Sequence, residues 1–173
     1  TLTGDQRAAL EGADFVLLQL RVGGQAARLT DETIPLRYGT IGQETTGAGG
    51  FAKALRTIPV VLGLAEDVRA YASSSAWIVD FTNPVGMVTQ ALVDDGHRAV
   101  GLCNVAIGLQ RELAARLGVA PDRMELEHVG LNHLSWERAV VPERLVERAE
   151  ALGIAGRPEL LALVGRAPRE GAK

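Results

Sequence analysis

Largely apolar residues gather in three short runs in the first two thirds of the chain. They are FVLLQL, AWIVDF and RAVGLC, at residues 15–20, 76–81 and 98–103. Short apolar runs without regular polar alternation are typical of parallel strands that are buried on both faces of a sheet. We therefore predict three strands of this kind, with both faces of their sheet covered.

Segments with helical spacing lie between and after these runs. Residues 50–72 have this spacing, and Pro59 is expected to kink or restart the helix. Another helix is expected to run through residues 90–94. An amphipathic helix is predicted at residues 105–118, where Gly118 ends it.

The remaining segments are less regular. The first residues are predicted to be the end of a helix that Gly12 closes. Residues 21–42 are rich in glycine and threonine and contain Pro35, which predicts a loop with at most short helical pieces. Residues 124–141 are predicted to form two short strands around a turn, and a helical tail is expected from Pro142.

The order strand, helix, strand, helix, strand describes half of a doubly wound sheet. We predict the α/β class, with a Rossmann-like sheet that lacks its first strand or strands, followed by the start of an α+β domain. The expected domains are residues 1–103 and 104–173. No G-x-G-x-x-G turn follows a predicted strand, so the residues that would bind a dinucleotide stay unassigned.

Composition narrows the function classes. The chain has 173 residues, 47% of them apolar and 4% aromatic, and a formal net charge of −3 at pH 7. A mild negative charge without a basic cluster argues against a nucleic-acid partner. The uninterrupted apolar runs are shorter than a membrane span. We expect a cytoplasmic protein that binds neither nucleic acid nor membrane.

Polar residues follow two of the predicted strands. Asn83 lies directly before Pro84, which favours an extended conformation for it, and Cys103 ends the next strand. Ligands bind at the carboxyl ends of strands in doubly wound sheets. Asn83 could therefore contact a ligand, or it could cap the helix that follows.

Cys103 and His133 could bind one metal ion, and each lies beside an asparagine, Asn104 and Asn132. A thiolate and a neutral imidazole are common ligands of first-row metals. Two protein ligands leave coordination positions open, as catalysis requires. The alternatives are a small buried thiol and a hydrogen-bonded core histidine.

The segment GQETTGAGG, residues 42–50, carries Glu44 in a loop whose glycines suggest a flexible backbone close to a ligand. Arg28 and Arg37 flank it, and either could pair with a phosphate or a carboxylate. The alternative is that these are surface charges on a long loop.

The other histidines and the tryptophans are expected to have no role in chemistry. We predict that His97 is solvated in a turn and that His128 lies on an exposed strand face. Trp77 and Trp136 lie in strand-like runs and are predicted to be in the core.

Taken together, these segments resemble glycoside hydrolase family 4. The matching stretches lie between about residues 13 and 136, and they include GQETTGAGGFAKALRTIP, AWIVDFTNPVGMVT, GLCNVAIG and VGLNHLSW. The strand-Asn-Pro pattern is more distantly similar to lactate and malate dehydrogenases, whose superfamily fold the resemblance implies.

The resemblance implies an NAD- and divalent-metal-dependent glycosidase, which is an exception to the usual two-carboxylate mechanism. In this family NAD takes a hydride from carbon 3 of the sugar, and a tyrosine removes the proton on carbon 2. The glycosidic bond then breaks by elimination, water adds, and the hydride returns. A metal, usually manganese, binds the oxygens on carbons 2 and 3. Substrates are commonly phosphorylated disaccharides or glycosides, and homodimers or homotetramers are expected.

Carried over by position, the resemblance makes Cys103 and His133 the metal ligands. It places Arg28, Asn83 and Asn132 at the substrate. A thiolate on manganese runs against simple hard–soft preference, so a softer ion such as iron, cobalt or nickel stays an alternative.

Two further residues acquire roles through the resemblance. Glu44 corresponds to the carboxylate that raises the basicity of the catalytic tyrosine. Asn104 stands where phospho-α-glucosidases tend to have aspartate, which favours hydrolysis of 6-phospho-β-glucosides. The alternatives are a 6-phospho-α-glucosidase, an α-galactosidase, a dehydrogenase-like oxidoreductase, and a non-catalytic module with the same fold.

Two parts of the family pattern do not occur in this chain. They are the glycine turn that precedes the first segments and the catalytic tyrosine that follows GLNHL, since Tyr38 and Tyr71 lie elsewhere. We therefore expect an internal fragment of a longer enzyme that is inactive by itself.

Overall fold

The structure, a computed structural model, describes residues 2–140. The chain divides into two compact units, residues 1–103 and residues 104–173, and each is described by itself. The helical tail predicted from Pro142 lies outside the described residues.

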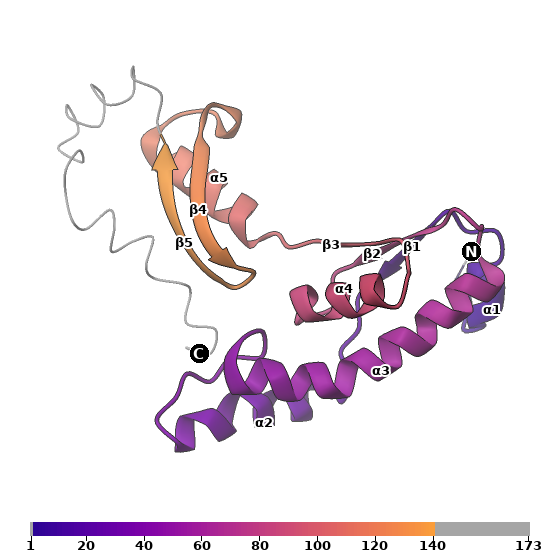
Figure 1. Ribbon diagram of the computed structural model, residues 1–173. Helices are drawn as coiled ribbons and strands as arrows, with labels where there is room; N and C mark the ends of the chain where they lie inside the picture. Colours follow the sequence, from indigo (N-terminus) through magenta and orange to yellow (C-terminus); the bar gives the residue numbers. More distant parts are fainter. Residues whose placement is uncertain (1, 141–173) are drawn as a thin grey trace. The chain divides into compact units, whose positions relative to one another are not determined.

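The first unit contains a three-stranded parallel sheet with the strand order β1-β2-β3, connected by helices (Figure 1). This arrangement confirms the predicted α/β class and the three predicted strands. Figure 1 also shows α2 beside the first half of α3. The elements in chain order are α1 (Gln6–Leu10), β1 (Phe15–Leu18), α2 (Gly24–Arg37), α3 (Gly47–Tyr71), β2 (Trp77–Asp80), α4 (Val85–Asp94) and β3 (Ala99–Gly101).

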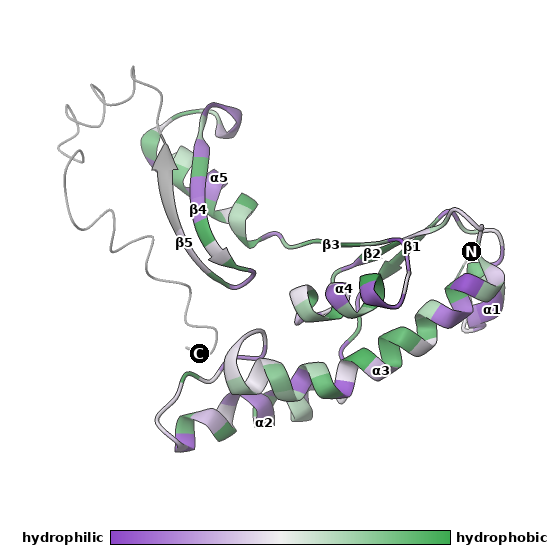
Figure 2. Ribbon diagram, viewed as in Figure 1, coloured by the Kyte–Doolittle hydropathy of each residue, from purple (hydrophilic) through white to green (hydrophobic). Residues whose placement is uncertain are grey.

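The core of this unit lies on one face of the sheet. Leu18 of β1 and Ile78 of β2 point to that face, since strand side chains alternate between the two faces. Helices α1, α3 and α4 cover them, and the apolar residues of these elements are green in Figure 2. The buried helical residues of this cluster are Leu10, Val61, Ala65, Val68, Val88 and Leu92.

The opposite face of the sheet is not covered by the described residues. Phe15, Leu17 and Trp77 are 66%, 71% and 38% exposed. The prediction that both faces are covered is therefore wrong for these residues, as is the placement of Trp77 in the core. The reason is that α1, α3 and α4 all contribute to the cluster on the other face.

Helix α2 occupies much of a segment that we predicted to be a loop. Pro35 lies in its last turn, where the ring removes the hydrogen bond to the Asp31 carbonyl. Gly49 at the start of α3 packs against that same carbonyl, and a Cβ at Gly49 would overlap it. The prediction failed because packing against α3, rather than local propensity, stabilises α2.

Pro59 was expected to kink or restart this helix, and α3 continues through it as one element of 25 residues, so the helix does not restart there. By length and composition it could cross a membrane, although we predicted no segment of that kind. Its residues Val61, Ala65 and Val68 nevertheless lie in the core against the sheet. This packing is that of the central helix of a folded domain.

The second unit contains α5 (Val105–Leu117), the short 3-10 helix η1 (Pro121–Arg123) and an antiparallel hairpin of β4 (Glu125–Leu131) and β5 (Leu134–Val140). Gly118 ends α5 with φ of 66°, which confirms the predicted stop. The hairpin confirms the two predicted strands. Trp136 is 67% exposed, so its predicted place in the core is wrong among the described residues.

The core cluster gives a direct test of the fold. Leu92 is fully buried, and Leu92→Ala should lower the free energy of unfolding by about 2–5 kcal/mol because it leaves a cavity. Leu29→Ala is the matched control, since Leu29 is 63% exposed and should change stability by less than about 0.5 kcal/mol. Urea unfolding followed by circular dichroism measures both, and equal effects would contradict this core.

Candidate functional site

The buried carboxylate Asp80 organises the carboxyl edge of the sheet. Its Oδ1 accepts a hydrogen bond from the backbone N–H of Thr82 at 2.8 Å. The hydroxyl of Thr82 in turn accepts one from the N–H of Leu20 at 3.1 Å. These bonds join the ends of β1 and β2.

Asp80 is completely buried, and desolvation by burial raises its pKa, although the hydrogen bonds from Thr82 and Thr89 act in the opposite direction. Our sequence reasoning did not single it out. A carboxylate within the apolar run AWIVDF was the signal that could have identified it.

Asn83 follows this edge and is half-buried. Its peptide bond to Pro84 is cis, and α4 begins at Val85 with Pro84 in the N-cap position. The alternative that Asn83 caps this helix is therefore wrong. Within residues 2–140 its carboxamide has no hydrogen-bond partner, so both its donors and its acceptor can serve a ligand.

Glu44 is the centre of a cluster of charged side chains near the start of α3. It is 3% exposed, and its Oε2 accepts hydrogen bonds from Lys53 Nζ and Arg21 Nη1, both at 2.6 Å. Its Oε1 lies 3.7 Å from Arg28 Nη1. The alternative that Glu44 is a surface charge is therefore wrong, and the structure brings Arg28 to it as a partner.

The ionisation of Glu44 depends on these cations. Burial raises its pKa, but the hydrogen bonds and charges of Lys53 and Arg21 outweigh burial and hold the pKa below its usual range. Glu44 is consequently a carboxylate at neutral pH. Lys53 and Arg21 were not identified from the sequence, although a lysine on the buried face of an apolar helix was a usable signal.

The glycines around Glu44 serve close packing rather than flexibility, which corrects our interpretation of the loop. A Cβ at Gly50 would lie 2.7 Å from the Thr45 carbonyl carbon, and one at Gly42 would overlap the Glu32 carbonyl oxygen. The Arg56–Asp31 ion pair, at 2.6 Å, stabilises the same contact between α2 and α3.

Arg28 and Arg37, the two arginines predicted to flank Glu44, have different surroundings. Arg28 donates to Glu32 Oε1 at 2.8 Å, one turn further along α2. Arg37 lies on the exposed surface at the end of that helix. Of the two arginines predicted to flank Glu44, the structure therefore places only Arg28 at the carboxylate.

Cys103 is half-buried and is the last residue of the first unit. Asn104 takes the N-cap position of α5, yet its side chain makes no capping hydrogen bond. The carboxamide is exposed, so it is not committed to the helix. β3 ends at Gly101, so Cys103 lies two residues beyond the strand that it was predicted to end.

Asn132 and His133 form the two-residue turn of the hairpin in the second unit, between the paired residues Leu131 and Leu134. His133 has φ of 58°, in the left-handed region that residues other than glycine seldom adopt. Backbone outliers of this kind are frequent at functional sites. A thiol and an imidazole are a suitable donor set for a transition metal, but the pairing of Cys103 with His133 on one ion stays a prediction.

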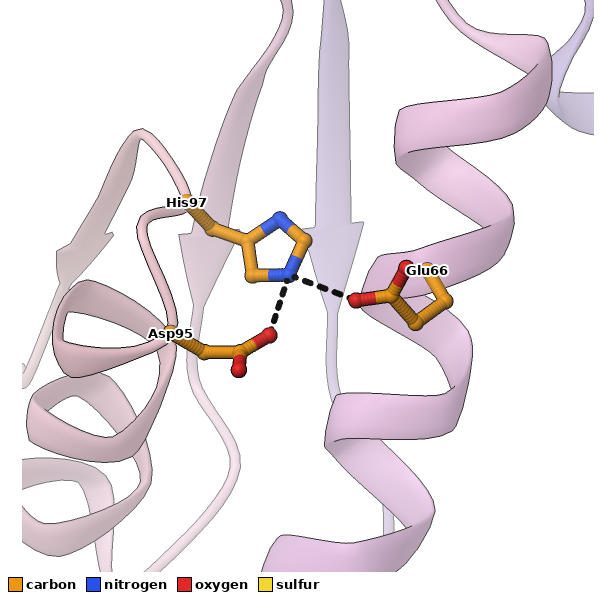
Figure 3. A group of neighbouring side chains, drawn as sticks. All are labelled: Glu66, Asp95 and His97. Carbon is orange, nitrogen blue, oxygen red and sulfur yellow. Dashed lines mark hydrogen bonds and ion pairs between the residues drawn. The ribbon is translucent and has the colours of Figure 1, made fainter.

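A second cluster joins Glu66 of α3 to Asp95 and His97 of the turn after α4 (Figure 3). His97 Nε2 lies 3.1 Å from Asp95 Oδ2, and the His97 side chain is only 5% exposed. The prediction that it is solvated is therefore wrong. Arg69 contacts all three side chains and supplies the positive charge, so this cluster connects α3 to the turn. The predicted exposure of His128 is confirmed.

Comparison with known proteins gives a consistent picture. The family described as "Family 4 glycosyl hydrolase" matches residues 1–119. A probable 6-phospho-beta-glucosidase of Bacillus subtilis is 47% identical over 160 residues, which are 91% of this chain and 36% of that protein. The chain thus spans about a third of the length of the curated relatives it matches.

Solved structures agree. The 6-phospho-beta glucosidase from Thermotoga maritima, with manganese, NAD+ and glucose-6-phosphate, matches with a TM-score of 0.71 and 39% identity over 84% of this chain and 37% of that chain. A 6-phospho-alpha-glucosidase from gut microorganisms, with NAD and Mn2+, has a TM-score of 0.73 and 31% identity over 86% of this chain and 36% of that chain. These similarities confirm the Rossmann-like fold.

The charge of Glu44 predicts a pH-dependent contribution to stability. Because its pKa is lowered in the folded state, the stabilisation is present above the ordinary glutamate pKa of 4.5 and is lost as pH falls through the lower folded pKa. Glu44→Gln should cost about 3–5 kcal/mol at pH 7 because it leaves Lys53 buried without a charged partner, and this cost should decrease as the pH falls through the folded pKa of Glu44 in urea unfolding. Glu112→Gln, at an exposed carboxylate of α5, is the control. A cost for Glu44→Gln that does not change with pH would contradict the assigned charge.

Asp80 gives a separate test. Asp80→Ala should cost about 1–3 kcal/mol, because the Thr82 N–H loses its acceptor in a buried position. Asp80→Asn keeps an acceptor oxygen and removes a buried charge, so it should cost less than about 1 kcal/mol. Equal losses of unfolding free energy for both variants in urea would show that the hydrogen bond from Thr82 to Asp80 does not stabilise the segment after β2.

Proposed function

Because the chain belongs to the family 4 glycosyl hydrolases, we propose that the full-length protein hydrolyses 6-phospho-β-glucosides with the help of NAD and a divalent metal, manganese. The observation that carries this proposal is the identity of 47% to the Bacillus subtilis relative across 91% of the chain. The exposed Asn104, in place of an aspartate, also supports the β-anomer.

Cys103 and His133 are the proposed metal ligands, since a half-buried thiol and a half-buried imidazole suit the donor set. A metal bound there supplies a Lewis acid for the sugar oxygens, and NAD supplies a temporary oxidant. A softer ion in place of manganese is compatible with the thiolate.

Arg28, Asn83 and Asn132 are the proposed substrate contacts. Arg28 would offer its guanidinium to the phosphate, which suits the fork of a guanidinium group. Asn83 and Asn132 would hydrogen-bond the sugar through their carboxamides. Glu44 would take part as a fixed negative charge, close to the tyrosine that acts as base.

The two units have different proposed roles. Residues 1–103 would form the second part of the NAD-binding domain, and residues 104–173 the beginning of the catalytic and substrate domain. The substrate would be a phosphorylated disaccharide or glycoside. A cytoplasmic homodimer or homotetramer is the proposed form of the full-length protein.

The α-anomer is the second candidate. The TM-score to the phospho-α-glucosidase structure, 0.73, is no lower than the 0.71 to the phospho-β-glucosidase structure. The shared fold therefore does not distinguish a preference for the β-anomer of the substrate from one for the α-anomer. The sequence identity distinguishes them only indirectly. An assay with both substrates is required.

The test uses the full-length gene product with p-nitrophenyl 6-phospho-β-glucoside and its α-anomer. We expect turnover of the β-anomer only when both NAD and Mn²⁺ are present. Cys103→Ser should reduce kcat/KM at least about 100-fold, since a metal site loses 10- to 100-fold even when an outer partner is removed.

His128→Ser is the matched control, because His128 lies exposed on β4 and should leave kcat/KM unchanged. Turnover of the α-anomer alone would replace the β-assignment. Turnover that needs neither NAD nor metal would contradict the proposed chemistry, and turnover of no glycoside would favour a dehydrogenase-like or non-catalytic role.

A further inference from the structure

Lys53 is unusual among the charged residues of the first unit. Its side chain is 2% exposed, although lysine is almost never fully buried without a partner. Removing an ammonium group from water costs several kcal/mol. In the described part of the chain its single hydrogen-bond partner is Glu44 Oε2, at 2.6 Å. This desolvation cost indicates that the buried Lys53 has a role that a lysine at the surface could not perform.

The three cations around Glu44 are not equivalent. Arg21, which follows β1, is 35% exposed, and Arg28 of α2 is 28% exposed. Water screens their interaction with the carboxylate, whereas the Lys53–Glu44 pair lies in a medium of lower dielectric constant. Lys53 therefore has the largest influence on the charge of Glu44.

Lys53 and Arg21 together orient the carboxylate. Both short hydrogen bonds, from Lys53 and from Arg21, end on Oε2. This leaves Oε1 on the side of Arg28, whose Nη1 lies 3.7 Å away. Arg28 is itself paired with Glu32, so it links α2 to the carboxylate while remaining partly open to solvent.

From this geometry we propose that Lys53 is a positioning residue of the active site. It holds Glu44 as a carboxylate, fixes Oε2, and directs Oε1 toward Arg28 and the reacting sugar. The proposal rests on the proposed function for the catalytic role of Glu44. Lys53 itself touches neither substrate nor cofactor and acts only through Glu44.

The test is a double-mutant cycle in the full-length enzyme with Lys53→Met, which keeps the length of the side chain and removes its charge. Alone, Lys53→Met should lower kcat/KM about tenfold at neutral pH and move the acid limb of its pH profile upward by roughly 1–3 units. In a Glu44→Gln background the same substitution should change kcat/KM by less than about twofold. Arg116→Met, at an exposed cation of α5, is the control.

A structural role would give different results. If Lys53→Met lowers kcat/KM by the same factor in both backgrounds and leaves the pH profile in place, the proposal is wrong. If Lys53→Met does not fold, the double variant should recover the fold, because both buried charges are then removed together. A double variant that also fails to fold would overturn the proposal.

Failure of the proposed function has a separate signature. If the protein has no glycosidase activity, urea unfolding still measures how the Lys53–Glu44 pair contributes to stability. The wild type should lose stability as pH falls from 5 to 3, and Lys53→Met should lose much less, since Glu44 then lacks its main cation. Identical pH dependence in the two proteins would overturn the role of Lys53, whatever the substrate is.

Discussion

The buried ion pair of Glu44 and Lys53 is the interaction on which the rest of the candidate site depends. Lys53 Nζ and Glu44 Oε2 are 2.6 Å apart, and both side chains are nearly inaccessible to water. An isolated charge at either position would be strongly unfavourable, so each residue requires the other. Through this pair, the loop before α3 is tied to the helix that forms the centre of the domain. The carboxylate then holds Arg21 and Arg28, and with them the end of β1 and the first half of α2.

A second buried carboxylate, that of Asp80, stabilises the carboxyl edge of the sheet. Asp80 and Thr82 join the ends of β1 and β2 and shape the segment that presents Asn83. The two carboxylates differ in their surroundings. Glu44 is surrounded by cations that lower its pKa, whereas Asp80 has only neutral donors and its pKa is raised by burial. One group therefore contributes a fixed negative charge, and the other contributes mainly hydrogen bonds that define a backbone conformation.

The strands, the hairpin and the end of α5 at Gly118 could be predicted from sequence, because apolar runs and helix-ending glycines are local signals. Helix α2 could not, since its glycine, threonine and proline residues are poor helix formers and its stability comes from α3. Likewise, the burial of His97 depends on Glu66 and Arg69, which lie about thirty residues away. The site residues that the family resemblance assigns could be named from the sequence alone. Lys53, Arg21 and Asp80 could not, because only the fold brings their partners to them.

The most direct test of this account is the titration of the Glu44 carboxyl group by ¹³C NMR in protein labelled at glutamate. The resonance can be assigned by its loss in Glu44→Gln. We predict a midpoint below the ordinary glutamate value of 4.5, in agreement with a carboxylate held by Lys53 and Arg21. A midpoint at or above that value would mean that burial outweighs the cations, and it would contradict the central place given to this ion pair.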